Sequence, residues 1–245
     1  MTDLAAHEIR DEHRDLADAA LSVLLDSSLE PIVDMVLTRR DGAYEALSAD
    51  GRVRFTCDPE SDPESPALVS VLEEEGANPI GNQATDTFSP LDAELAHKHP
   101  HRSDNSYPNA YEQIVQLFDA PAAPDLCVLH SARHNWEDQG GHIGEHGSLG
   151  VVQARAPWVI AGRGVANLGV VPRAARLVDV APTIASLLGC APISEGQSSA
   201  RFLSRQDGVA RDDVLVASDR PPRHVVGFLF DGANPNVLYA MAASG

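Results

Sequence analysis

The chain has 245 residues, of which 43% are apolar, so it is long enough to bury a hydrophobic core in one or two domains. Its formal charge of −18 argues against nucleic acid and anionic membranes as partners. It has neither a signal-peptide pattern nor an apolar run near the roughly 18 residues of a membrane span. Its three widely spaced cysteines fit reduced thiols. We therefore expect a soluble, cytoplasmic protein.

The first predicted element is an amphipathic helix over residues 4–25. Apolar residues recur there at helical spacing, with charged residues between them. Pro31 falls where such a helix should end. We assign residues 1–30 to this helical segment.

Residues 31–106 predict a small α+β lobe. The hairpin signals Asp41-Gly42 and Asp50-Gly51 separate apolar runs and so predict an antiparallel meander. Its expected strands are 32–37, 43–47 and 52–55. A short helix at 67–75 and a polar stretch follow. Three alternating histidines in that stretch are compatible with metal binding, although an exposed polar loop is the simpler interpretation; they are His97, His99 and His101.

Strands alternate with helices in the rest of the chain, which is typical of an α/β layer with parallel strand pairing. The predicted strands are 125–131, 157–161 and 224–230. The predicted helices are 108–118, 178–188 (closed by Gly189) and 235–244. We expect 107–193 to form a core α/β segment, 194–222 to be a connector, and 223–245 to add a strand and a helix to the core.

The loop after the 125–131 strand carries His142 and His146 in a run where four of nine residues are glycine. Imidazole is the commonest protein ligand for zinc-like metals, and a glycine-rich backbone can come close to a ligand. The glycines also argue against a helix over this run. We interpret it as a metal-binding loop at the end of a buried strand. His130 and His134, at its start, are further candidates with an equally good structural explanation.

Asp231 directly follows the apolar run 225–230, which is typical of a central parallel strand. Open α/β sheets place ligand-binding groups at the carboxyl ends of such strands. Gly232 then permits a sharp turn into a helix. An Asp that only makes turn hydrogen bonds is the alternative interpretation.

Three segments resemble the alkaline phosphatase superfamily, specifically its type I phosphodiesterase/nucleotide pyrophosphatase branch; they are 228–238, 144–165 and 179–189. The resemblance implies a mostly parallel sheet flanked by helices, with 31–106 as an insertion lobe. It also implies two divalent metals, most simply zinc, with Asp231 on one and His146 on the other, and His142 and His134 as further candidate ligands. The implied reaction is hydrolysis of a phosphate ester, in a small molecule or nucleotide, through a covalent phospho-enzyme.

The chain also departs from that family. The Asp-Gly strand comes last instead of first, no Thr or Ser nucleophile follows it, and Asp-His-Gly is absent. We therefore expect no catalytic residue and no turnover from this chain alone, as part of a truncated or permuted protein. One alternative is a non-catalytic phosphatase-like binding module. Another is a sulfatase-like hydrolase, in which Asp138 and Gln139 would be oxygen ligands for calcium.

Overall fold

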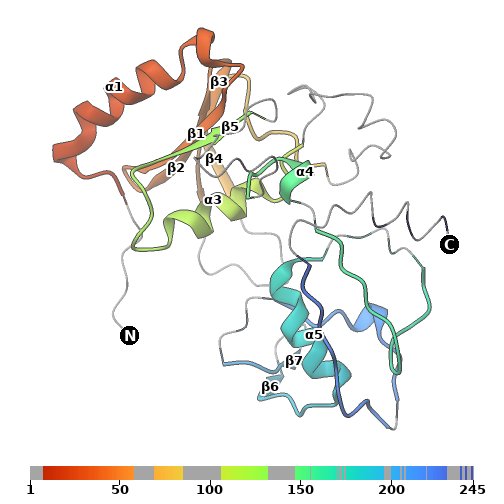
Figure 1. Cartoon of the computed structure of the whole chain (residues 1–245). Coiled ribbons are helices and arrows are strands. Elements are labelled where there is room, and N and C mark those ends of the chain that lie inside the picture. The colour runs from red at the N-terminus through yellow and green to blue at the C-terminus, as the bar shows by residue number, and fades with distance from the viewer. Residues whose placement is uncertain are drawn as a thin grey trace. The chain divides into compact units, whose positions relative to one another are not determined.

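A computed structural model of the chain divides into two compact units (Figure 1). Unit 1 comprises residues 1–58, 68–156 and 232–245, and unit 2 comprises residues 59–67 and 157–231. The structure describes residues 8–57, 69–84, 106–131, 147–195 and 200–230, with gaps at 155, 170, 172, 174, 205, 207 and 219, and also 238, 241 and 244. No helix in these ranges is long and apolar enough to cross a bilayer.

Unit 1 is built on a five-stranded sheet with strand order β4-β3-β2-β1-β5. The strands are β1 (Val33–Arg40), β2 (Ala43–Ser48), β3 (Gly51–Cys57), β4 (Val69–Gly76) and β5 (Leu126–His130). Strands β1 to β4 form a meander, and β5 joins the sheet beside β1. Each of the four pairings is antiparallel.

The hairpin signals in the sequence are confirmed. Asp41 and Gly42 both have positive φ, 51° and 73°, as a two-residue type I′ turn between β1 and β2 requires. A two-residue connection also joins β2 to β3, but it consists of Ala49 and Asp50, because Ser48 pairs with Gly51; the predicted Asp50-Gly51 turn is therefore displaced by one residue. The expected meander is therefore correct in its first three strands.

The expected fold class is wrong: the sheet is antiparallel throughout, not a mostly parallel alkaline-phosphatase-like sheet flanked by helices. The 125–131 strand is confirmed as β5, but it runs antiparallel to β1 at an edge of the sheet. Residues 157–161 and 224–230 belong to no strand. The prediction of a parallel sheet rested on the alternation of strands and helices along the chain. That alternation determines neither which strands become neighbours nor whether they run parallel or antiparallel. The expected division of the chain into segments 1–30, 31–106, 107–193, 194–222 and 223–245 stays a prediction.

The predicted helix at 67–75 is also wrong, because most of this segment forms β4. Strand β4 pairs with β3, and this register brings acidic residues opposite arginines. Arg52 contacts Glu73 at 3.2 Å and Glu75 at 2.8 Å. Cross-strand pairs of opposite charge stabilise a sheet and here override the helix propensity of a glutamate run.

Helices cover both faces of the sheet, because successive strand residues point to opposite sides. Helix α1 (Arg14–Leu24) packs Leu21 against Val36 and Leu47, and α3 (Ala110–Phe118) packs Ile114 and Phe118 in the cluster on the other face. The predicted helix at 108–118 is thus confirmed, although it begins after Pro108. The amphipathic helix over 4–25 is confirmed from Arg14 to Leu24; its first four residues lie outside the described ranges. A short helix, α4 (Val151–Ala154), follows the histidine-rich loop.

Unit 2 contains α5 (Val180–Leu187), which is preceded by a 3-10 turn, η4 (Leu177–Asp179). Gly189 closes α5 with a φ of 70°, so the helix predicted at 178–188 and its glycine stop are confirmed. The expected connector holds a two-stranded hairpin of β6 (Ser194–Glu195) and β7 (Ala200–Arg201), and a 3-10 turn, η5 (Asp212–Val214).

Candidate functional site at the shared end of β1 and β5

The principal predicted metal ligands lie outside the described residues: His134, His142, His146 and Asp231. The same holds for His97, His99 and His101, and for Asp138 and Gln139. Their roles therefore stay predictions. Within the described ranges, no group of three or more His, Cys, Asp or Glu side chains is arranged to hold a metal ion. The described residues do show where the chain stands immediately before and after the two histidine-bearing segments, 85–105 and 132–146.

The segment 132–146 leaves the sheet beside the first residues of β1. His130, the last residue of β5, lies opposite Val33. The next residue, Ser131, donates its N–H to the Ile32 carbonyl at 2.7 Å and its hydroxyl to the Pro31 carbonyl at 2.6 Å. These bonds hold the start of the segment at one end of the sheet.

One nitrogen of the His130 ring lies within hydrogen-bond distance of a carbonyl oxygen. Its Nδ1 lies 2.9 Å from the Ser131 carbonyl, and because a carbonyl only accepts, Nδ1 carries the hydrogen. In a neutral ring the lone pair is then on Nε2. Metal-bound histidines use this arrangement, one nitrogen donating to a carbonyl or carboxylate and the other facing the metal. His130 therefore has the tautomer that a metal ligand or a proton acceptor needs.

The same segment returns next to residues that precede α3. The Val151 N–H donates to the Ser106 carbonyl at 2.8 Å, and Leu149 is buried in the core cluster on the α3 face. Ser106 also donates its hydroxyl to the Ala84 carbonyl. Residues 84 and 106 bound the other histidine-bearing segment, 85–105. Ser106 therefore bonds to a described residue next to each of the two segments: Ala84 before 85–105, and Val151 after 132–146.

A buried carboxylate connects these anchor points. Asp34 occupies the irregularity where Val33 and Met35 of β1 face consecutive residues of β5, so it is an extra residue in a β-bulge. It is 9% exposed, and it accepts a 2.8 Å hydrogen bond from the Tyr107 hydroxyl. Bulges recur beside active sites because they redirect a side chain. Here the bulge lets Asp34 reach Tyr107, the neighbour of Ser106.

Asp34 and Tyr107 are residues that the sequence analysis missed. The available signal was one aspartate in the otherwise apolar run 32–37, where a buried carboxylate needs a partner. The shared end of β1 and β5 thus carries two separate polar features. A buried carboxylate is bonded to a phenol hydroxyl that packs in the α3 cluster, and an imidazole lies opposite Val33, which packs in the α1 cluster on the other face of the sheet. These groups can accept or donate protons, and the carboxylate and imidazole are also metal-ligand types.

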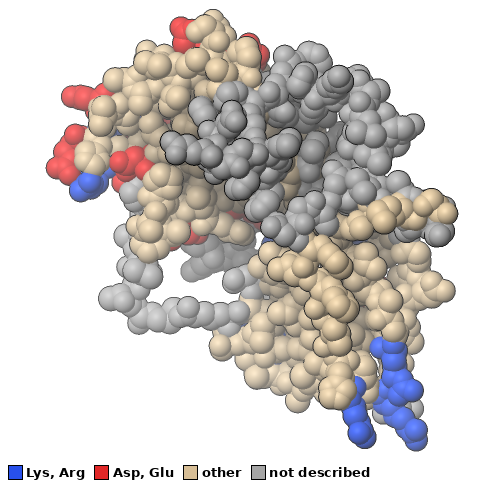
Figure 2. Space-filling model, in the orientation of Figure 1, with Lys and Arg blue, Asp and Glu red and all other residues tan. Residues whose placement is uncertain are grey.

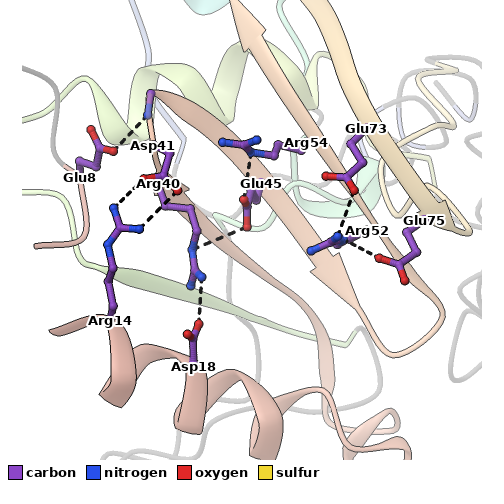
Figure 3. A network of polar contacts seen from close by, with 11 residues as sticks. Glu8, Arg14, Asp18, Arg40, Asp41, Glu45, Arg52, Arg54, Glu73 and Glu75 are labelled. Carbon is purple, nitrogen blue, oxygen red and sulfur yellow. Dashed lines mark hydrogen bonds and ion pairs between the residues drawn. The ribbon is translucent and has the colours of Figure 1, made fainter. Parts of the chain in front are cut away.

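The other buried charge in unit 1 has a structural role (Figure 3). Glu45, in the middle of β2, is 6% exposed, with Arg54 at 3.3 Å and Arg40 at 3.9 Å. Burial raises the pKa of Glu45, and the two arginines oppose that rise. Arg40 also contacts Asp18 of α1 at 2.9 Å. The network joins α1 to the sheet and has no histidine or hydroxyl partner among the contacts drawn.

Comparison with known proteins gave no match: no protein-family model, no curated protein sequence and no solved structure corresponds to this chain.

Proposed function

We propose that this chain supplies part of a metal-dependent site for phosphate-ester hydrolysis. In this proposal His142 and His146 bind a divalent metal, most simply zinc, and His134 and Asp231 are the next candidates. The substrate is a phosphate ester of a small molecule or nucleotide. The proposal depends on the side chains and their anchoring, and not on a parallel sheet.

The anchoring of segment 132–146 is the observation that carries the proposal. It starts at His130 and Ser131, and it ends beside Ser106, whose neighbour Tyr107 donates to Asp34. The described residues on the two sides of this segment, Ser131 and Val151, are thus both hydrogen-bonded to the fold, and the partner of Val151, Ser106, adjoins the residue that bonds the buried carboxylate. Polar groups around a metal site orient its ligands, and this supports a metal role for the segment.

Metal ions would provide the positive charge that an anionic substrate needs and that the rest of this acidic chain lacks. A phosphate ester is anionic, and the chain has a formal charge of −18. Divalent metals neutralise phosphoryl oxygens and activate the attacking oxygen. The residues of this chain would hold and orient the metal, with His130 and Asp34 as the described groups closest in sequence and pairing to the loop.

A non-catalytic metal-binding module is the second candidate. The absence of a Thr or Ser nucleophile in the expected sequence context favours it, and so does the antiparallel sheet, which does not provide the expected parallel-strand framework. The two candidates share the metal site and differ only in turnover. Metal binding is therefore tested first and hydrolysis second.

The experiment measures zinc binding to the metal-free chain by calorimetry and by metal analysis after dialysis. We expect His142→Ala and His146→Ala to weaken binding at least about tenfold, a loss seen even for residues that only orient ligands. His224→Ala changes an exposed histidine of unit 2 and serves as the matched control. A wild-type chain without zinc affinity, or two loop variants that bind like the control, would contradict the proposal.

Hydrolysis is then assayed with a chromogenic phosphodiester in the presence of zinc. We expect no turnover from the chain alone, because it lacks the nucleophile. Turnover that disappears in His146→Ala would show that the chain is an active hydrolase and would exclude the non-catalytic module. The same assay is repeated on the product of the full coding sequence, and zinc binding without turnover in that product would exclude the hydrolase.

A further inference from the structure

The segment 224–230 in unit 2 is an extended apolar run with no strand partner among the described residues. Val226, Phe228 and Phe230 are 73%, 78% and 72% exposed, and Leu229 is 98% exposed. The rings of Phe228 and Phe230 stack with centroids 6.4 Å apart, so these alternate residues share one side of the segment. Leu229 belongs to the opposite side. Both sides of the run are therefore apolar and exposed.

The rest of unit 2 does not bury apolar side chains well enough to explain this run as ordinary surface. As far as the chain is described, the buried apolar residues lie at or before Val151, within unit 1, apart from Pro182 of α5. Large apolar residues of unit 2 are exposed instead, among them Val159, Leu177 and Ile193. Exposed apolar patches of this kind mark interaction sites. An extended strand with two apolar sides fits a partner that adds a strand to it.

The charge distribution favours a second copy of the chain as that partner. Residues 157–231 contain eight arginines, no lysine and seven acidic residues, whereas the other residues contain ten basic and 29 acidic ones. In Figure 2 the described face of unit 2 is largely uncharged, with basic side chains gathered at one end. Two copies can therefore meet through unit 2 without the repulsion that their acidic parts would produce.

The charges at the two ends of segment 224–230 favour antiparallel over parallel pairing of the two copies. Arg220, Arg223 and His224 come at its start, and Asp231 follows its end in the sequence. Antiparallel pairing of two identical strands places the basic start of each beside the acidic end of the other, whereas parallel pairing places like charges together. Opposite-charge pairs across strands are favourable and like-charge pairs are not.

We propose that two copies of this chain form a symmetric dimer by antiparallel pairing of their segments 224–230. The two-fold axis passes at Gly227, so that Val226 faces Phe228 of the other copy and Arg223 faces Asp231. A Cβ at Gly227 meets no atom within 4 Å, so a side chain can be introduced at this position without a clash. The same surface of each copy forms the interface, as a closed two-fold dimer requires.

The first test measures the mass of the full chain by sedimentation and light scattering over a concentration series. EDTA is present throughout, so that metal binding does not enter and the result is independent of the proposed function. We expect a dimer whose dissociation constant rises at least about tenfold in Phe228→Lys, as the loss of about 1.4 kcal/mol would produce. Leu16→Lys, at an exposed position of α1, should leave the dimer unchanged. A wild-type chain that stays monomeric up to about 100 µM would overturn the proposal.

A charge exchange tests the orientation. Arg223→Glu and Asp231→Arg should each weaken the dimer, and the double variant should restore it, because the pair is then reversed in both halves of the interface. In a Cys190→Ser background, Gly227→Cys should form a disulfide-linked dimer under oxidation, whereas Ser218→Cys should not. A dimer in which the charge exchange does not restore association, or in which residue 227 does not cross-link, would use another surface and would also overturn the proposal.

Discussion

Unit 1 buries large apolar side chains on both faces of its sheet, including Phe55 and Phe118 on one face and Val36 and Leu47 on the other, whereas the described part of unit 2 buries mainly polar side chains and Pro182 and exposes several of its large apolar ones. The buried polar residues of unit 2 are Asp179, Thr183 and Gln206. Apolar burial is the main favourable term in folding, so unit 1 has its own source of stability. Unit 2 depends on hydrogen bonds inside it and, in our proposal, on a second copy outside it.

The interior of unit 2 is organised around Asp179. Its carboxylate accepts hydrogen bonds from the backbone N–H of Arg176 at 2.9 Å and of Val209 at 3.0 Å. Its carbonyl accepts from the Thr183 hydroxyl at 2.6 Å, and that hydroxyl accepts from the Arg211 N–H at 2.9 Å. One aspartate thus joins the start of α5 to the segment 209–211.

The largest effect that separates the two units is expected from truncating a leucine in each. Leu37→Ala removes a side chain that is 1% exposed, and Leu177→Ala one that is 86% exposed. We expect the first change to lower the free energy of unfolding by about 2–5 kcal/mol and the second by no more than about 0.5 kcal/mol. Urea unfolding followed by circular dichroism measures both. Equal losses would contradict the contrast between the interiors.

A smaller effect, confined to unit 2, is expected from Asp179→Ala. This change leaves two partly buried N–H groups, those of Arg176 and Val209, without their acceptor, which costs about 1–2 kcal/mol. Hydrogen exchange should become faster in α5 and around Val209 and stay unchanged in the sheet of unit 1. Asp212→Ala is the matched control, because the Asp212 carboxylate is exposed and accepts from the Ser186 hydroxyl at 2.7 Å. Protection that is lost equally in both variants would rule out a special role for Asp179.

The smallest effect is a pH dependence of opposite sign in the two units. Burial raises the pKa of Glu45, so its contribution to stability is present below the ordinary glutamate pKa and is lost as pH rises. Hydrogen bonding from Arg211 lowers the pKa of Asp213, so that contribution is present above the ordinary aspartate pKa and is lost as pH falls.

Two variants separate these contributions in unfolding measurements between about pH 2 and pH 7, because the Asp213 change falls below the ordinary aspartate pKa and the Glu45 change above the ordinary glutamate pKa. Relative to wild type, Glu45→Gln should gain stability as pH rises. Asp213→Asn should lose stability over the same rise, because wild type regains its ion pair. Parallel profiles for the two variants would contradict the opposite directions of the two pKa shifts.

Local features of the fold could be predicted where the chemistry is local. Asp41-Gly42 gives a two-residue turn because both residues tolerate positive φ, and Gly189 ends α5 for the same reason. The helix at 110–118 follows from its spacing of apolar residues. Pairing was not predictable in this way: 69–76 became a strand because β3 offered arginines opposite its glutamates.

Only part of the candidate site could be predicted from the sequence. His130 follows an apolar strand, and its position at a strand end could be predicted. The Asp34–Tyr107 pair could not be predicted, because these residues are 73 positions apart and meet only in the folded chain, at the bulge of β1 beside β5. A hydrogen bond between such distant residues leaves no pattern at short range.

The sequence by itself determined the turns, the main helices, the acidic charge and the location of the histidine-rich loop, because each depends on neighbouring residues. Only the tertiary structure decided that β5 runs antiparallel beside β1, that a bulge turns Asp34 toward Tyr107, and that residues 224–230 are exposed. An apolar run has the same composition whether other strands cover it or not. Burial is a property of its surroundings, and long-range pairing alone supplies those.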